Sequence, residues 1–207
     1  MTASLNFAAF SPTTYADVLG RSQVMSLGIR EMWPGIPRLA GPAFTVQCPP
    51  GDNLMLHAAI YRAAPGDVIV VQAGDVEYAL SGGNVCAIAQ QRGIAGFVAD
   101  GVIRDVAEVR EARFPVFARG AVPIPGKKQT LGTLNQPIVC GGVSVSPGDI
   151  IIADEEGVVA IPAAQQQTVW EQALHKSERE SLQTLTDWEA NHHAKIDGIL
   201  KDLGFQE

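Results

Sequence analysis

The chain has 207 residues, 46% of them hydrophobic, and a formal net charge of −7 at pH 7. This length suits one hydrophobic core and is short for two. The negative charge argues against general binding to nucleic acid or to anionic membranes. No run approaches the roughly 18 apolar residues of a membrane-spanning helix, and no secretory signal opens the chain.

The cysteines Cys48, Cys86 and Cys140 lie in apolar contexts, and their number is odd. Both facts favour small buried thiols over a disulfide framework. We therefore expect a protein of the reducing cytoplasm.

Alternating elements fill the first part of the chain. Residues 1–10 are expected to form an unanchored arm, and a helix capped by Ser11 should follow. The proline-bearing segment 30–42 is predicted to be irregular. Strands are predicted at 43–48 and 67–73, and the second is apolar along most of its length, as in the buried strands of a layered α/β sheet.

The stretch 82–108 is the most informative part of the sequence. Gly82 and Gly83 open a short apolar helix, and a buried strand is predicted at 94–99, ending in Asp100-Gly101. Arg104-Asp105 follows, with Glu108 one helical turn beyond, in a helix expected over 104–113. Polar groups at the carboxyl end of a strand, opposite a helix amino terminus, are what a small-anion site in an α/β protein requires.

The second half of the chain has a different sequence pattern from the first. A loop at 120–134 holds Lys127-Lys128, and short strands separated by turns are predicted from 137 to 162. From Ala163 the pattern is helical. We expect one domain over 1–207, with a core at about 13–170 and a helical tail at about 163–205 that packs at a subunit interface.

Six runs resemble one family. It is the RraA-like family, which holds the 4-hydroxy-4-methyl-2-oxoglutarate aldolases and the regulator of ribonuclease E activity A. The runs are GPAFTV (41–46), PGDVIVV (65–71), the GxxxxxDGxxRD core (96–105), FPVFARG (114–120), GGVSVSPGD (141–149) and ADEEGVV (153–159). The resemblance covers about residues 13–170.

This resemblance implies an α/β fold: a layered αββα sandwich of the swivelling phosphohistidine-domain type, assembled as a homotrimer or hexamer. It also implies a lyase that uses Mg²⁺ or Mn²⁺ to cleave 4-hydroxy-2-oxo acids to pyruvate and to decarboxylate oxaloacetate. By position, Arg104 would hold the substrate, Asp105 would reach the metal, and Glu108 would fill the last acidic place, possibly through water. Backbone N–H groups of 82–85 (Gly82, Gly83, Asn84 and Val85) would bind the pyruvate carboxylate.

The sequence departs from the family pattern at one place. The first acidic position, twenty-one residues before Arg104, is Gly83. Another carboxylate could substitute, with Glu108, or Glu178 or Glu180 of a neighbouring subunit, as candidates. Otherwise the chain runs a variant reaction in which decarboxylation survives better than aldol cleavage, and Gly83→Asp should then raise the aldolase-to-decarboxylase ratio.

The residues support a metal-dependent class II lyase on chemical grounds as well. Cleaving a 2-oxo acid generates a pyruvate enolate, which a metal and an arginine can stabilise. A Schiff-base route would need a desolvated lysine. The only lysines outside the tail are Lys127 and Lys128, in a polar loop.

The same residues can also be interpreted as purely structural. Arg104, Asp105 and Glu108 could be an exposed helix start. His57 is expected to be a packed or interfacial histidine, and Lys127-Lys128 a solvated loop that could also attract an anionic substrate. The alternative function is a non-catalytic trimer that regulates a protein partner, and Asp105 favours the enzyme.

Overall fold

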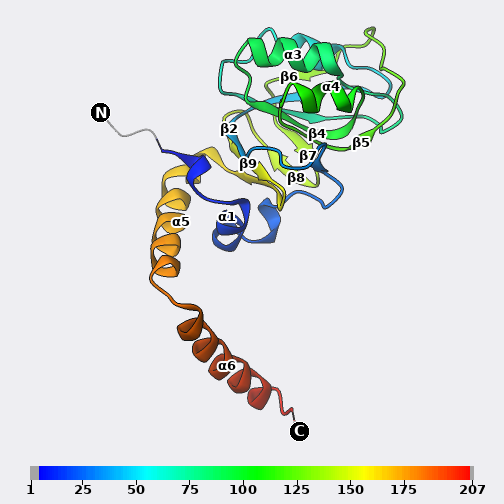
Figure 1. The fold of residues 1–207 in the computed structure, drawn as a ribbon. Coiled ribbons are helices and arrows are strands. Elements are labelled where there is room, and N and C mark those ends of the chain that lie inside the picture. Colours follow the sequence, from blue (N-terminus) through cyan, green and yellow to red (C-terminus); the bar gives the residue numbers. More distant parts are fainter. Residues whose placement is uncertain (1–4, 206–207) are drawn as a thin grey trace.

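The computed structural model describes residues 5–205, and a curved mixed sheet forms the centre of the fold (Figure 1). Its strands run in the order β1-β5-β4-β3-β2-β9-β10, and β6 pairs with β2 beside this path. They are β1 (Arg30–Glu31), β2 (Leu39–Gln47), β3 (Val68–Gln72), β4 (Gly96–Ile103), β5 (Val116–Ala121), β6 (Thr133–Leu134), β9 (Ile150–Asp154) and β10 (Gly157–Ile161). A separate antiparallel pair consists of β7 (Ile138–Cys140) and β8 (Val143–Val145).

The sheet is parallel at its centre and antiparallel toward its edges. β2, β3, β4 and β5 are parallel neighbours, whereas β1, β9 and β10 pair antiparallel. The two edges approach each other, since β1 contacts β10 and, in the segment before β1, the Met25 N–H donates to the Val158 carbonyl of β10 at 2.9 Å. The fold is thus mixed α/β with a nearly closed, barrel-like sheet, which confirms the predicted α/β class; the layered αββα sandwich of the phosphohistidine-domain type stays a prediction.

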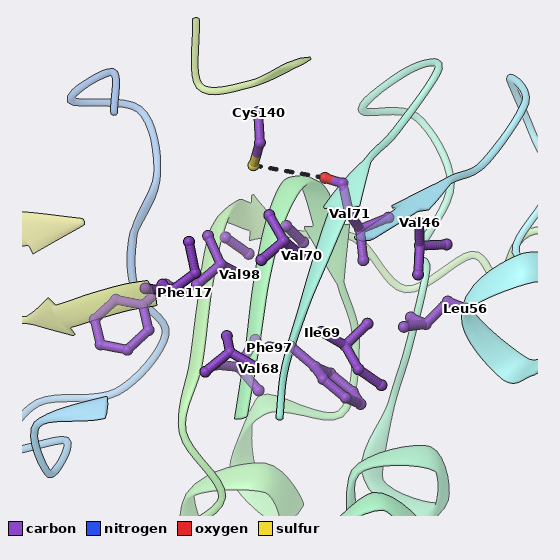
Figure 2. Close-up of a cluster of buried hydrophobic side chains, with 14 of the residues drawn as sticks. Val46, Leu56, Val68, Ile69, Val70, Val71, Phe97, Val98, Phe117 and Cys140 are labelled. Carbon is purple, nitrogen blue, oxygen red and sulfur yellow. Dashed lines mark hydrogen bonds between the residues drawn. The ribbon is translucent and has the colours of Figure 1, made fainter. Parts of the chain in front are cut away.

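The central strands explain why this sheet is stable. The side chains of Val68, Ile69, Val70 and Val71 are all fully buried, as expected for a strand covered on both faces. Figure 2 shows them beside neighbours from β4 and β5, with the Cys140 thiol donating to the Val71 carbonyl at 3.7 Å. All three cysteines are buried and free, as predicted.

Six α-helices and three short 3₁₀ helices are found among residues 5–205. The α-helices are α1 (Pro12–Leu19), α2 (Leu54–Ala59), α3 (Gly83–Gln91), α4 (Val106–Glu111), α5 (Gln166–Ser181) and α6 (Leu185–Asp202). The 3₁₀ helices are η1 (Phe7–Ala9), η2 (Arg21–Gln23) and η3 (Ala163–Gln165). The predicted cap of α1 is confirmed, because the Thr14 N–H donates to Ser11 Oγ. In Figure 1, α3 and α4 lie together on one side of the sheet, away from α1 and α5.

The two tail helices differ in what they contact. α5 packs on α1 through Val169 and Ala173, which join a second hydrophobic cluster around Tyr15. α6 has no buried residue and extends away from the body (Figure 1). Its apolar side chains are therefore exposed, among them Trp188, Ile196, Ile199 and Leu200. No helix among residues 5–205 is long and apolar enough to cross a membrane.

Two local predictions need correction. Residues 1–4 lie outside the described part of the chain, but residues 5–10 are not a free arm: Tyr15 donates its hydroxyl hydrogen to the Phe7 carbonyl at 3.0 Å, and the Trp170 indole N–H donates to Asn6 at 3.3 Å. Segment 30–42 is not irregular throughout, because β2 already begins at Leu39. Pro42 is tolerated because β2 changes partner there, from β9 to β3.

Candidate functional site

The strand that leads into the site is longer than the sequence predicted. β4 continues past Asp100-Gly101 to Ile103, across an irregularity in its pairing with β5. The Asp100 carboxylate lies elsewhere, pairing with Arg119 and accepting the Gly141 N–H at 2.8 Å. Asp100 therefore serves the fold, and the polar groups of the candidate site begin at Arg104.

Arg104 and Asp105 form the turn between β4 and α4. The Arg104 N–H donates to the Ser81 carbonyl at 2.9 Å, which ties this turn to the segment before α3. Asp105 has a left-handed backbone (φ 57°), which aspartate tolerates better than most residues. Its Oδ2 accepts the Gly83 N–H at 3.1 Å and lies 3.4 Å from Arg104 Nε. The carboxylate thus lies at the positive amino terminus of α3.

The glycine pair makes room for two carboxylates. A Cβ atom added at Gly82 would overlap Asp105 Oδ2, and one added at Gly83 would overlap Glu108 Oε2 and lie 2.8 Å from Glu108 Cδ. Glu108 therefore reaches the place where this chain lacks the family's first acidic residue. A carboxylate at position 83 could be added only by moving Glu108, which reverses the expectation that Gly83→Asp would improve aldol cleavage.

The backbone N–H groups at the start of α3 divide into two sets. The Gly83 N–H donates to Asp105 and is not free for a substrate. The Asn84 and Val85 N–H groups make no hydrogen bond within residues 5–205. Both residues line a cavity of about 70 Å³ together with Gly82, Arg104 and Asp105. We call this side of the cavity, with Glu108 next to it, the carboxylate wall.

Three further residues line the cavity, Asn53 at the start of α2, His57 within α2 and Lys128 from the loop after β5, and we call them the α2 wall. Asn53 is only 3% exposed, and its Nδ2 donates to the Ala79 carbonyl at 3.2 Å. Its Oδ1 is buried without a hydrogen-bond partner among the described residues. Burial, with a smaller effect of the Lys128 charge, lowers the pKa of His57 to about 4. His57 is thus neutral at physiological pH. It is half-buried, in agreement with the predicted packed histidine, and it also lines the cavity.

A buried carboxylate positions the α2 wall. Asp52 Oδ2 accepts the N–H groups of Gln129 and Thr130 at 2.7 and 2.9 Å, and its Oδ1 accepts that of Leu54 at 2.8 Å. Burial works to raise the pKa of Asp52, but these N–H donors and the Lys128 charge together lower it. Lys128 therefore lies on a loop whose backbone is hydrogen-bonded beside α2, and its side chain is exposed, in agreement with the predicted solvated loop.

The carboxylate wall offers hard oxygen ligands for a cation. Asp105 Oδ1 makes no hydrogen bond to residues 5–205, and the Glu108 carboxylate lies nearby, against Gly83. Within those residues no three His, Cys, Asp or Glu side chains gather as a metal cluster. One or two carboxylates with room for water and substrate oxygens suit Mg²⁺ or Mn²⁺, which are often bound with few protein ligands.

An arginine–carboxylate pair at the end of a parallel strand, facing free N–H groups of a helix, defines an α/β protein with a small-anion cavity. The chain belongs to the RraA-like family, described as Aldolase/RraA, whose model matches residues 13–160. A relative from Halalkalibacterium halodurans, provisionally named 4-hydroxy-4-methyl-2-oxoglutarate aldolase, is 43% identical over 171 residues, covering 82% of this chain and 78% of the relative.

Solved structures agree with this placement. RraAS2 of Streptomyces coelicolor, described as an unusual member of the RNase ES inhibitor RraA family, is 29% identical with a TM-score of 0.75, covering 84% of this chain and 92% of that one. The RNA-processing inhibitor RraA from Thermus thermophilis is 28% identical with a TM-score of 0.66, covering 78% and 94%. The family thus includes proteins named as aldolases and proteins named as RNA-processing inhibitors.

Proposed function

We propose that this protein is a divalent-metal-dependent lyase that releases pyruvate from small 2-oxo acids, by aldol cleavage, oxaloacetate decarboxylation or both. The observation that carries the proposal is the carboxylate wall. There Asp105 is held against Arg104 and the start of α3, while the Asn84 and Val85 N–H groups and one Asp105 oxygen stay unpaired within residues 5–205. The provisional aldolase names of relatives support the same reaction class.

The substrate's pyruvate portion would bind between Arg104 and α3. The free N–H groups of Asn84 and Val85 suit its carboxylate, because a helix amino terminus favours negative charge. Arg104 would donate charge-assisted hydrogen bonds to the keto-acid oxygens. A Mg²⁺ or Mn²⁺ ion held by Asp105 would supply Lewis-acid stabilisation of the developing enolate charge. Arg104 would stabilise that same charge from its own side.

Glu108 is the proposed base for aldol cleavage. The C4 hydroxyl must lose a proton as the C3–C4 bond breaks and its electron pair moves into the enolate. Glu108 reaches the space beside Gly83, the position at which the family resemblance implies an acidic residue. It would take that proton, directly or through a water, and the enolate would then be protonated at C3 to give pyruvate.

We propose further that the protein acts as a homotrimer or hexamer, within the phosphohistidine-domain type of fold. The exposed apolar face of α6 supports an assembly, because contact with another subunit would bury it. Light scattering at micromolar concentration should give at least three times the monomer mass. A monomer would contradict this assembly.

A second candidate function is a non-catalytic trimer that binds a protein partner. The same exposed side chains of α6 favour it, together with the likeness to RraA structures. The presence of Asp105 beside Arg104 favours the enzyme over this regulator.

The test is a pyruvate-release assay on 4-hydroxy-4-methyl-2-oxoglutarate and oxaloacetate in the presence of Mg²⁺. We expect turnover of at least one of the two acids. Absence of pyruvate from both would reject the lyase and leave the regulator.

A further inference from the structure

The largest group of exposed apolar side chains lies on α6. Of the fourteen large hydrophobic residues that are exposed within 5–205, six belong to this helix or to the residue that ends it: Leu185, Trp188, Ile196, Ile199, Leu200 and Leu203. A capping box at Thr184 begins α6 and separates it from α5. The family model ends at residue 160, so the fold shared with relatives does not account for these side chains.

The six side chains form one stripe along the helix, which we call the α6 stripe. At 100° per residue they fall within about 120° of the helix circumference. Leu185 and Ile196 are eleven residues apart, as are Trp188 and Ile199. An 11-residue repeat has 3.67 residues per turn, close to the 3.6 of a straight helix, so the stripe runs nearly along the helix axis. A second long helix can therefore follow the stripe over its whole length.

Two polar residues, Glu189 and His192, share the α6 stripe. They occupy the places that Leu200 and Leu203 fill one repeat later. The His192 ring stacks on Trp188 with 4.5 Å between the ring centroids and 12° between the planes. The stripe is thus an aromatic and aliphatic surface with a polar group near its middle. Polar groups at such positions in helix bundles fix the register of the partner helix.

The exposed area of the α6 stripe is large enough for a specific contact. Its six apolar residues leave between 36% and 80% of their surface in water. At about 200 Å² for a fully exposed side chain of this size, the stripe presents roughly 600 Å². The largest apolar patch on a typical monomer is about 300–600 Å². Two such stripes packed together would bury roughly 1,200 Å², which reaches the range of specific interfaces.

Helix length and charge indicate which partner covers the stripe. Within the described part of the chain, α5 and α6 are the only helices longer than 9 residues, and α5 already packs on α1. A helix that matches the stripe in length is therefore another copy of α6. An anionic membrane surface suits it poorly, because α6 carries four acidic residues and two lysines.

We propose that α6 is a self-association helix, whose stripe packs against the α6 stripes of other copies in a helix bundle outside the shared fold. This inference deepens the proposed homo-oligomer, on which it rests, and does not depend on the lyase chemistry. It assigns to residues 185–203 a contact that buries their apolar side chains. The rest of each subunit remains free to form the contacts of the shared fold.

Cross-linking tests whether α6 helices contact one another. His192→Cys places a thiol in the middle of the stripe, where two paired helices meet whether they run parallel or antiparallel. The three native cysteines are buried and should not compete. The control is Ala194→Cys, an exposed position on the opposite side of α6. With a short bismaleimide at micromolar protein, we expect at least about fivefold more cross-linked dimer from His192→Cys than from the control. Equal yields would overturn the pairing.

A charge in the stripe tests whether apolar burial drives the contact. Ile199→Asp and Ala194→Asp are each added to His192→Cys, so that the same residue is introduced on the stripe and on the opposite side. Pairing would remove the charge at position 199 from water, whereas position 194 stays solvated. We expect the cross-linked yield to fall at least about fivefold with Ile199→Asp and to stay unchanged with Ala194→Asp. A yield that Ile199→Asp leaves unchanged would overturn the role of the stripe.

Light scattering separates this contact from the proposed assembly as a whole. If wild type has at least three times the monomer mass but His192→Cys cross-links no more than Ala194→Cys, the α6 contact is wrong and the assembly stands. A monomeric wild type without cross-linking would overturn both. Cross-linking through the stripe together with a dimer mass would support the α6 contact and contradict the trimer. None of these measurements requires pyruvate release, so they are independent of the outcome for the lyase.

Discussion

The two walls of the cavity are built in different ways. The carboxylate wall comes from one stretch of about 27 residues, in which a glycine pair lets two carboxylates approach the start of α3. The α2 wall joins α2 to a loop 77 and 78 residues further along the chain, through the N–H groups that Asp52 accepts. A short stretch can thus encode the proposed reactive groups, whereas the other groups that line the cavity are brought there by tertiary contacts.

After the loss of the proposed metal ligand Asp105, the largest expected effect concerns Glu108 in the carboxylate wall. If it moves the proton of the C4 hydroxyl, Glu108→Gln should lower aldol cleavage by about 10²-fold or more, the usual worth of general base catalysis. Decarboxylation of oxaloacetate starts from an ionised carboxylate and should lose much less. Both rates are measured at one Mg²⁺ concentration, with Glu111→Gln, an exposed glutamate on the same helix, as the control. Equal losses in the two reactions would assign the proton transfer elsewhere.

Gly83→Asp tests the close approach in the same wall. The new Cβ would overlap the Glu108 carboxylate, so we expect Glu108 to be displaced and the aldolase-to-decarboxylase ratio to fall. Because the atoms to be moved are the end of an exposed, flexible side chain, we expect the free energy of unfolding to change by only about 0.5 kcal/mol or less, which denaturant unfolding can measure. A suitable control is Gly198→Asp, because a Cβ at Gly198 meets nothing within 4 Å. A higher ratio with unchanged stability would show that both carboxylates fit.

Arg104→Lys separates charge from geometry. Lysine keeps the positive charge and loses the planar fork that binds a keto acid at two points. We expect kcat/KM for pyruvate release to fall at least about tenfold, which corresponds to roughly 1.4 kcal/mol. If the variant has the same kcat/KM as wild type, Arg104 does not bind the substrate and is only a surface residue before α4.

The smallest expected effect belongs to His57 in the α2 wall. Because its pKa falls from 6.5 to about 4 on folding, the unfolded chain binds more protons between these values, and stability should fall as the pH drops through this window. Allowing for the partial exposure of His57, the loss is about 1 kcal/mol. It should be present in wild type and absent in His57→Gln when their unfolding free energies are compared at pH 7 and pH 4. The same pH dependence in both would show that His57 titrates normally.

The sequence predicted the parts of the fold that depend on local pattern. The apolar run at 67–73 indicated a buried central strand, and Ser11 indicated the start of α1; both are confirmed. The start of β2 at Leu39 was missed, because Pro42 marks a change of strand partner that only the assembled sheet shows. The hydrogen bond from the Tyr15 hydroxyl to the Phe7 carbonyl was also missed, because the hydrophobic periodicity of the sequence gives no sign of it.

The candidate site shows the same division. Arg104, Asp105 and Glu108 could be identified from their spacing and the family resemblance. The approach of Glu108 to Gly83 could not, because it depends on how α4 packs on α3. Nothing in the sequence distinguished Asn53 beyond its place at the start of a helix. Lys128 could not be told apart from Lys127, because the hydrogen bond that holds their loop beside α2, from the Gln129 N–H to Asp52, is visible only in the structure.

The central claim is that the carboxylate wall works with a divalent cation to release pyruvate. The most direct measurement follows pyruvate release by wild type and Asp105→Asn after treatment with EDTA and during titration with Mg²⁺. The account predicts that EDTA abolishes wild-type turnover, that Mg²⁺ restores it, and that Asp105→Asn stays at least about 10³-fold slower at saturating Mg²⁺. Full turnover after EDTA, or an Asp105→Asn variant as active as wild type, would contradict it.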